Sequence, residues 1–141
     1  MTVDLVEFLT ARLDEDERVI EAPETWTAFD ENEPTGTRRV DVDHSFERVT
    51  ACTRAWRGVH IARHDPARVL AEVDAKRRIV ERHGPAVLCG GGGAQYYNTT
   101  RVCRSCESPK QFPEQAWPCP TLRLLALPYA GHADYDEAWR P

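Results

Sequence analysis

Three cysteines in the second half of the chain have the residue type and spacing of a metal site. Cys103 and Cys106 form a C-x2-C pair, and two thiolates at this spacing can reach one tetrahedral Zn²⁺ across a tight turn. Cys119 stands directly before Pro120, and proline favours the first position of a helix. Cys119 is therefore predicted at a helix N-cap, where free N–H groups and the helix dipole favour a thiolate. These three residues are the predicted sulfur ligands.

A tetrahedral site needs a fourth ligand, and the sequence offers two. His83 is expected at the last turn of a helix, on the same side as Ile79 and Val80, and directly before Gly84-Pro85. Cys89 is the alternative. We favour His83 because the end of an element directed at the core positions a ligand well, which would leave Cys89 as a free thiol.

The five cysteines could also have other roles. They could be small core residues, disulfides or a redox pair. An odd count and the lack of a secretory signal disfavour disulfides. A thioredoxin-like pair would enter a helix, whereas Glu107-Ser108-Pro109 follows this one. One structural Zn²⁺ is thus the predicted cofactor.

A second set of residues suggests an enzyme. His60 and His64 are four residues apart and could share one helix face. They could act with Asp65 or His44, and Cys52 could act as a nucleophile with a nearby histidine. No metallohydrolase signature surrounds them, and no general acid–base pair can be assigned from spacing. Capping and packing roles are the simpler interpretation, so no catalytic residue is predicted.

Helical patterns supply most of the framework. Apolar residues at helical spacing predict an N-terminal helix over 4–20 and a central helix over 66–82. A short helical turn is predicted over 56–64, and a C-terminal helix over 120–127 ends at a proline. Residues 129–139 suggest a turn and a short final helix.

Strand patterns cluster in the first half. Strands are predicted over 26–29, 38–43 and 46–52, and strand-like pieces over 86–89 and 95–102. The simplest architecture for the first three is a small antiparallel meander. Its expected packing residues are Trp26, Phe29, Val40, Val42 and Val49.

The predicted fold class is α+β: an N-terminal helix, a small antiparallel meander, a basic central helix, and a zinc knuckle that closes onto a C-terminal helix. The knuckle is the segment from Cys103 to Cys106. A length of 141 residues favours one domain over 1–141. Within it, 1–58 holds the first helix and the meander, and 59–141 holds the other helices and the zinc-knuckle region.

Charge is distributed unevenly. Residues 1–47 carry 14 acidic and 4 basic side chains, net −10, whereas residues 48–130 carry 6 and 13, net +7. The basic middle could contact nucleic acid or an acidic protein; the alternative is that the two halves neutralise each other. No segment approaches the roughly 20 apolar residues of a membrane span, and the acidic start is unlike a signal peptide. A cytoplasmic location and no membrane partner are therefore expected.

The chain resembles a known family in two strings, His60 to Val73 and Cys119 to Ala130, and at its ends in Asp4 to Leu9, Asp134-Tyr135 and Trp139. They are similar to the domain-of-unknown-function family 6221, small uncharacterised proteins of actinobacteria and their phages. In that family a histidine follows the basic helix, and a close cysteine pair and a helix-opening cysteine come after it. The resemblance implies these metal ligands: His83, Cys103, Cys106 and Cys119. It implies no activity.

The expected function is a small zinc-stapled binding or adaptor module that contacts a protein or nucleic acid through its central helix. The basic residues expected to carry this contact are Lys76, Arg77, Arg78 and Arg82, with Arg101 and Arg104 near the knuckle. The alternative is a small metal-dependent or cysteine/histidine hydrolase. The absence of a recognisable catalytic set makes a non-enzymatic role the favoured prediction.

Overall fold

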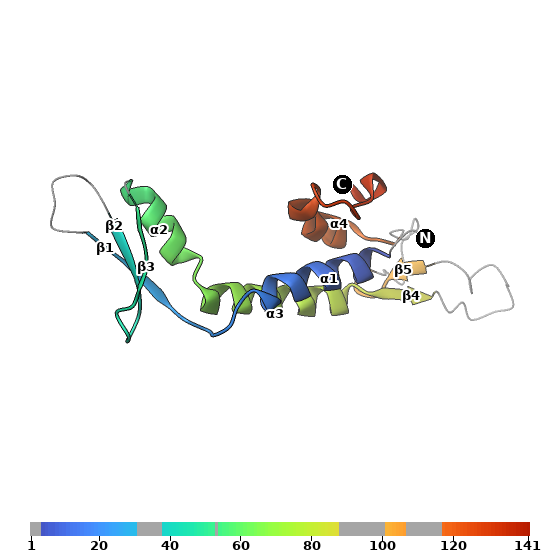
Figure 1. Ribbon diagram of the computed structural model, residues 1–141. Helices are drawn as coiled ribbons and strands as arrows, with labels where there is room; N and C mark the ends of the chain where they lie inside the picture. Colours follow the sequence, from blue (N-terminus) through green and yellow to red (C-terminus); the bar gives the residue numbers. More distant parts are fainter. Residues whose placement is uncertain (1–3, 31–37, 53, 88–100, 107–116) are drawn as a thin grey trace, which may run out of the picture. The chain divides into compact units, whose positions relative to one another are not determined.

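The computed structural model describes residues 4–30, 38–52, 54–87, 101–106 and 117–141. Helices and short antiparallel strands make an α+β fold, as predicted (Figure 1). The chain divides into two compact units. We call residues 16–74 the sheet unit, and residues 1–15 with 75–141 the cluster unit. The prediction of a single domain remains a prediction.

The sheet unit is built on a three-stranded antiparallel meander. Strands β1 (Trp26–Asp30), β2 (Arg38–Val42) and β3 (Arg48–Cys52) lie in the order β1-β2-β3, close to the predicted ranges. β-Branched and aromatic residues in each strand favour the extended backbone. Each strand pairs with its sequence neighbour, which is the usual result of short connections.

A bulge in β2 changes which side chains are buried. The pairing of β2 with β3 shifts between Val40 and Asp41, so two consecutive side chains are fully buried there. Asp41 forms an ion pair with Arg39 (Nη2 to Oδ2, 2.6 Å). Phe29 was expected in the core but is 41% exposed. It pairs with Arg39, one position along from the buried Val40, and successive side chains in a strand face opposite ways.

Helix α2 (Ala55–Arg63) contacts all three strands. Gly58 allows this close approach: a Cβ added there would lie 3.1 Å from the Cβ of Arg38. The predicted short helical turn is thus a nine-residue helix. Cys52, named above as a possible nucleophile, is buried at the end of β3, with 9% of its surface exposed.

In the cluster unit, α1 (Leu5–Arg18) presents one apolar face. Asp4 caps it by accepting a hydrogen bond from the Val6 amide (2.8 Å). The buried residues recur at spacings of three and four, as a helix stripe requires: Leu5, Phe8, Leu9, Arg12 and Leu13. This helix extends slightly less far than predicted, and its last three residues belong to the sheet unit.

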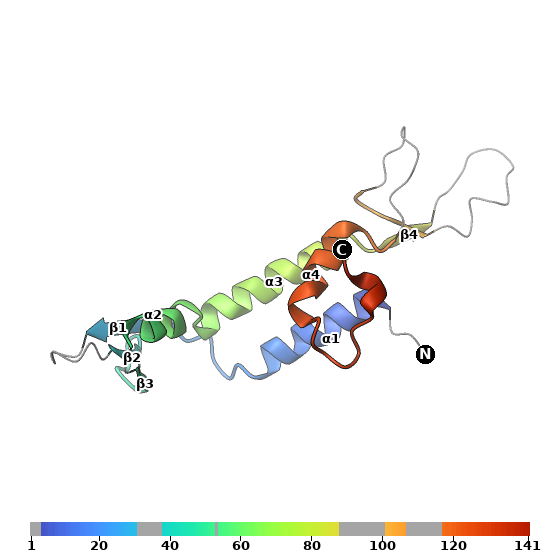
Figure 2. The ribbon, with the colours of Figure 1, turned by 90° about the horizontal axis from the view of Figure 1, so that it is seen from above.

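Aromatic contacts attach the C-terminal segment to α1. The Phe8 ring lies within 5.1–6.3 Å, centre to centre, of the rings of Tyr129, His132, Tyr135 and Trp139. Figure 2 shows the segment from α4 (Pro120–Ala126) onward lying beside α1. The expected final helix consists of two 3-10 turns, Leu127–Tyr129 and Glu137–Trp139.

The central helix α3 (Pro66–Arg82) has the predicted bounds and leads to a two-stranded ribbon. Strand β4 (Pro85–Val87) pairs antiparallel with β5 (Arg101–Cys103). Both strands have three residues, so this ribbon has few backbone hydrogen bonds. Among the described residues, no helix has the length and apolar content needed to cross a membrane.

Candidate metal centre

The end of α3 positions His83. Its amide donates to the carbonyl of Ile79 (2.9 Å), so the helical hydrogen-bond pattern reaches this residue. The Ser105 hydroxyl then donates to the carbonyl of Arg82 (2.6 Å), satisfying one of the helix's unpaired C-terminal carbonyls. The helix end is therefore tied directly to the turn that holds the cysteine pair.

The β4–β5 ribbon positions Cys103 and Cys106. Cys103 pairs with Pro85 at the end of the ribbon, and the Arg104 amide donates to the carbonyl of Gly84 (3.0 Å). A tight turn over residues 104–106 follows. It brings the second cysteine back toward the helix end, as a C-x2-C pair requires.

Cys119 is the N-cap of α4, as predicted, and Pro120 occupies the first helical position. The Arg123 amide donates to the Cys119 carbonyl (3.2 Å), which closes the first helical turn. The Cys119 side chain accepts no capping hydrogen bond. Its sulfur is therefore available to the site.

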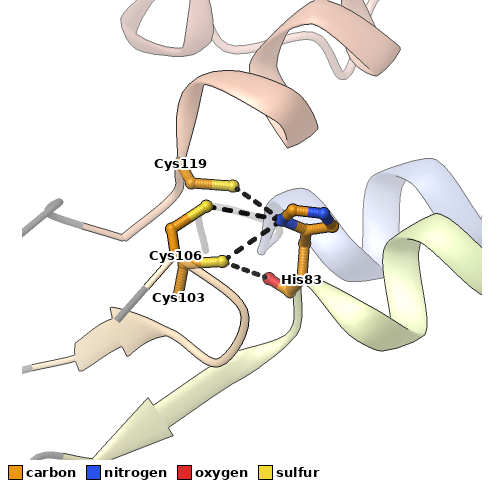
Figure 3. Close-up of side chains that lie close together, drawn as sticks. All are labelled: His83, Cys103, Cys106 and Cys119. Carbon is orange, nitrogen blue, oxygen red and sulfur yellow. Dashed lines mark hydrogen bonds between the residues drawn. The ribbon is translucent and has the colours of Figure 1, made fainter. Parts of the chain in front are cut away.

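The four predicted ligands meet in space. The ligand atoms of His83, Cys103, Cys106 and Cys119 all lie within 4.8 Å of one another (Figure 3). From the His83 Nδ1, the distance is 3.4 Å to the Cys103 Sγ and 3.6 Å to each of the Cys106 and Cys119 sulfurs. Cys103 and Cys119 are fully buried, and the other two are half-buried.

These distances fit a tetrahedral ion better than a hydrogen-bonded cluster. With Zn–S of about 2.3 Å and Zn–N of about 2.05 Å, a regular tetrahedron separates nitrogen from sulfur by about 3.6 Å. One ring nitrogen can make one good hydrogen bond, yet three sulfurs surround the His83 Nδ1 at nearly equal distances. The donor set, three thiols and one imidazole, suits a soft or borderline divalent metal.

Hydrogen bonding lowers the pKa of Cys103. Burial acts to raise the pKa of this thiol, but the amides of Cys106 and Ser105 and the Cys106 and Cys119 side chains act in the opposite direction, and the net pKa lies below its usual value. Amides that donate to a sulfur stabilise the thiolate. Of the two thiols in the knuckle, Cys103 is therefore the more readily ionised.

Cys106 behaves in the opposite way. Burial, hydrogen bonding with Cys103 and the negative charge of Cys119 and Cys103 raise its pKa to about 12. Neighbouring thiolates repel one another, so a full set of three requires a cation between them. The cluster therefore needs the charge of a bound cation for all its sulfurs to be ionised at neutral pH.

The remaining cysteines have different positions. Cys52 lies at the end of β3 in the sheet unit and does not belong to the cluster. Cys89, the alternative fourth ligand, is outside the described residues. The described cysteines form no disulfide.

The residues of the enzyme hypothesis do not form a comparable group among the described residues. His60 and His64 are exposed, with ring centres 4.4 Å apart. Asp65 accepts from the amides of Arg68 (2.8 Å) and Trp26 (3.4 Å) and so serves as the α3 cap. His44 lies in an exposed turn with φ of 73°.

Sequence reasoning missed the residues that support the ligands. The Ser105 hydroxyl and the Gly84 carbonyl each join the knuckle to the end of α3. Ser105 lies between the paired cysteines, and Gly84 directly follows His83. Their positions in the sequence could have indicated this role, because residues between or next to the paired ligands must form the turn that holds them.

Comparison with known proteins agrees with the resemblance described above. The model of DUF6221, described as a family of unknown function, matches residues 2–141. No curated protein and no solved structure matches the chain.

Proposed function

The chain belongs to the DUF6221 family of unknown function, and we propose that it is a binding or adaptor module stapled by one structural Zn²⁺. The proposed ligands are His83, Cys103, Cys106 and Cys119. The observation that supports this is the set of nearly equal nitrogen–sulfur distances, 3.4–3.6 Å, around one ring nitrogen.

A structural rather than catalytic ion follows from the number of protein ligands. Four side chains complete a tetrahedron and leave no position for water or substrate, whereas catalytic zinc keeps one position open. The two fully buried sulfurs support the same conclusion. The ion would join the end of α3, the β4–β5 ribbon and the start of α4.

Metal analysis of the purified full chain tests this proposal. We expect one zinc per chain, and a Co²⁺-substituted protein with the visible absorption of a tetrahedral thiolate site. Cys119→Ser should lose the zinc, whereas Cys52→Ser should retain it because Cys52 lies outside the cluster. Less than about half a zinc per chain in the unaltered protein, purified without chelator, would overturn the proposal.

A Cys89→Ser variant separates the two assignments of the fourth ligand. Full zinc content in this variant, together with loss of zinc in His83→Ala, supports His83. The opposite pair of results assigns the site to Cys89.

For the adaptor role, we propose that basic side chains of α3 and the knuckle contact an acidic protein or a nucleic acid. Arg82 and Arg104 are both exposed, and each adjoins a proposed ligand in the sequence. Other cations of this helix have partners within the chain: the Arg77 guanidinium lies 2.7 Å from the Asp14 carboxylate, and Lys76 and Arg78 also have partners. Arg82 and Arg104 are therefore the first residues to test.

Binding assays with labelled DNA and RNA at several salt concentrations distinguish the two kinds of partner. Affinity that falls steeply with salt indicates phosphate contacts and should weaken in Arg82→Gln/Arg104→Gln. The matched control is Arg140→Gln, which removes a cation paired with Glu137. A protein partner is assigned by two results together. The chain forms no complex with nucleic acid, and it captures a defined acidic protein from the native host that the same double variant no longer captures.

We also propose a cytoplasmic location. The described cysteines are free thiols, and reducing compartments maintain cysteine in this form. Fractionation of the native host, with zinc content measured in each fraction, tests this part of the proposal.

A further inference from the structure

The sheet unit contains a cavity that the zinc proposal does not use. Its volume is about 470 Å³, within the range of roughly 300–1,000 Å³ typical of small-molecule sites. The lining comes from the segment after α1, the start of β1, the end of α2 and the first turn of α3, all within residues 16–74. The lining residues are Val19, Ile20, Glu21, Ala22, Glu24, Trp26, His64, Pro66 and Val69.

Most of this lining is apolar or aromatic. Ile20, Pro66 and Val69 are half-buried, and Trp26 contributes an indole. Two contacts connect the segment after α1 to the neighbouring elements: the Trp26 amide donates to Asp65 Oδ2 (3.4 Å), and the Ala67 amide donates to the Glu24 carbonyl (3.0 Å). The apolar part of a flat ligand could therefore pack against this surface.

Among the described side chains of the lining, the polar groups that remain available are acceptors. The Trp26 Nε1 donates to Glu24 Oε2 (3.1 Å), which uses the only side-chain donor of the indole. The Glu21 carboxylate is exposed and receives no hydrogen bond from the described residues. Within the described part of the chain, no lysine or arginine lines the cavity.

His64 adds another acceptor. Its Nδ1 lies 2.8 Å from the carbonyl oxygen of His60. A carbonyl only accepts, so Nδ1 carries the proton of this hydrogen bond, and in the neutral ring Nε2 is left as an acceptor. The charge of the whole unit has the same sign as the cavity lining: residues 16–74 hold 13 acidic and 8 basic side chains, net −5.

From this combination we propose that the cavity binds an organic ammonium cation with a flat apolar body. The apolar body would pack on Ile20, Val69 and the Trp26 indole. The cation would bind the Glu21 and Glu24 carboxylates, and its position over the indole would add a cation–π interaction. An anion with the same body would meet two carboxylates and, among the described side chains of the lining, no available donor.

The test uses the full zinc-loaded chain and three probes. Tryptamine has the ring and the cation, indole-3-acetate has the same ring with an anion, and methylammonium has the cation without the ring. Binding is followed through the ¹H–¹⁵N signal of the Trp26 indole, assigned with Trp26→Phe. We expect saturable binding of tryptamine and at least tenfold weaker binding of each of the other two.

Variants assign any binding to the cavity. Glu21→Gln should weaken tryptamine at least fivefold, whereas Glu47→Gln, an exposed glutamate of the same unit outside the lining, should not. Ala22→Leu adds bulk at an exposed lining position and should also weaken it. Equal binding of indole-3-acetate, no saturable response, or full tryptamine binding in both variants would overturn the proposal. None of these outcomes affects the zinc site, which has its own measurement.

Discussion

The two units are stabilised in different ways. In the sheet unit, three strands of five residues pair along their length and α2 contacts all of them. In the cluster unit, the two strands have three residues each, α4 has seven, and the C-terminal segment ends in 3-10 turns. Short elements contribute few backbone hydrogen bonds, and that is the part of the chain where four metal-type ligands meet. The comparison teaches that a cluster of side chains can join elements that have little regular strand pairing.

Removal of zinc is the strongest way to separate the two units. Structural zinc contributes an apparent free energy of about 10–16 kcal/mol in zinc-finger peptides. Chelation should therefore abolish hydrogen-exchange protection around His83, Cys103 and α4, while β1 to β3 keep theirs. Hydrogen exchange measured by mass spectrometry, with and without chelator, provides the readout. Equal loss of protection in both units would show that the ion supports the whole chain.

Substitution of a single ligand should have the next largest effect. Serine is a poor replacement for thiolate at a soft site. Loss of a supporting partner usually lowers metal affinity by about 10- to 100-fold, so Cys119→Ser should lower zinc affinity by more than about 100-fold. Competition with a chromogenic chelator measures the change, and Cys52→Ser serves as the control. Unchanged affinity in Cys119→Ser would remove this residue from the site.

In the sheet unit, a buried valine of the central strand tests the contribution of packing. Val40 is fully buried, so Val40→Ala should lower the free energy of unfolding of this unit by about 2 kcal/mol through lost contacts and a cavity. Zinc content should stay at one per chain. Val59→Ala, at a position 38% exposed, should change stability by less than about 0.5 kcal/mol. Denaturant unfolding followed in the zinc-loaded protein distinguishes the two variants.

Acidification should weaken zinc binding by the cluster unit. Zinc competes with protons for the thiols, and the pKa of Cys106 without metal is about 12, so this thiol is protonated at neutral pH and zinc must displace its proton. Affinity should therefore fall as the pH is lowered, by at least about tenfold, or about 1.4 kcal/mol, for each pH unit. Zinc titrations from about pH 8 to pH 6 test the slope. An affinity independent of pH would contradict thiol coordination.

The smallest expected effect concerns helix contact with the sheet. A methyl group at Gly58 would lie 3.1 Å from the Arg38 Cβ, so α2 or Arg38 must shift, and this cost of about 1 kcal/mol should offset the roughly 0.5–1 kcal/mol that alanine gains over glycine inside a helix. Gly131→Ala meets no atom within 4 Å and should be close to neutral. Thermal unfolding of both variants provides the comparison. A stabilised Gly58→Ala would show that this contact adapts at no cost.

Much of the framework could be predicted from the sequence because its signals are local. Helix stripes and caps indicated α1, α3 and α4, and alternation in short β-branched runs indicated the meander. The bulge at Val40 and Asp41 could not be predicted, since it depends on how β3 aligns with β2. The exposure of Phe29 follows from the β1–β2 register, which places Ala28 rather than Phe29 opposite the buried Val40.

Most of the candidate site could be predicted from the sequence. Cys103 and Cys106 are linked by spacing, and Cys119 by the proline after it, so three of the four residues carried local signals. The proximity of His83 to them depends on the contacts of Ser105 and Gly84 with the end of α3. The cavity beside Trp26 gave no signal, because its lining residues come from four separate elements.

The chain separation between ligands has a consequence for how this sequence can change. His83 and Cys119 are 36 positions apart, and the segments between ligands are joined at one common point. Doubling the length of a loop whose two ends are held costs only about 0.6 kcal/mol of closure entropy. An insertion between Cys106 and Cys119 should therefore be tolerated far better than a change of one residue between Cys103 and Cys106, and that interval is a natural position for introducing an affinity tag or a fluorescent label.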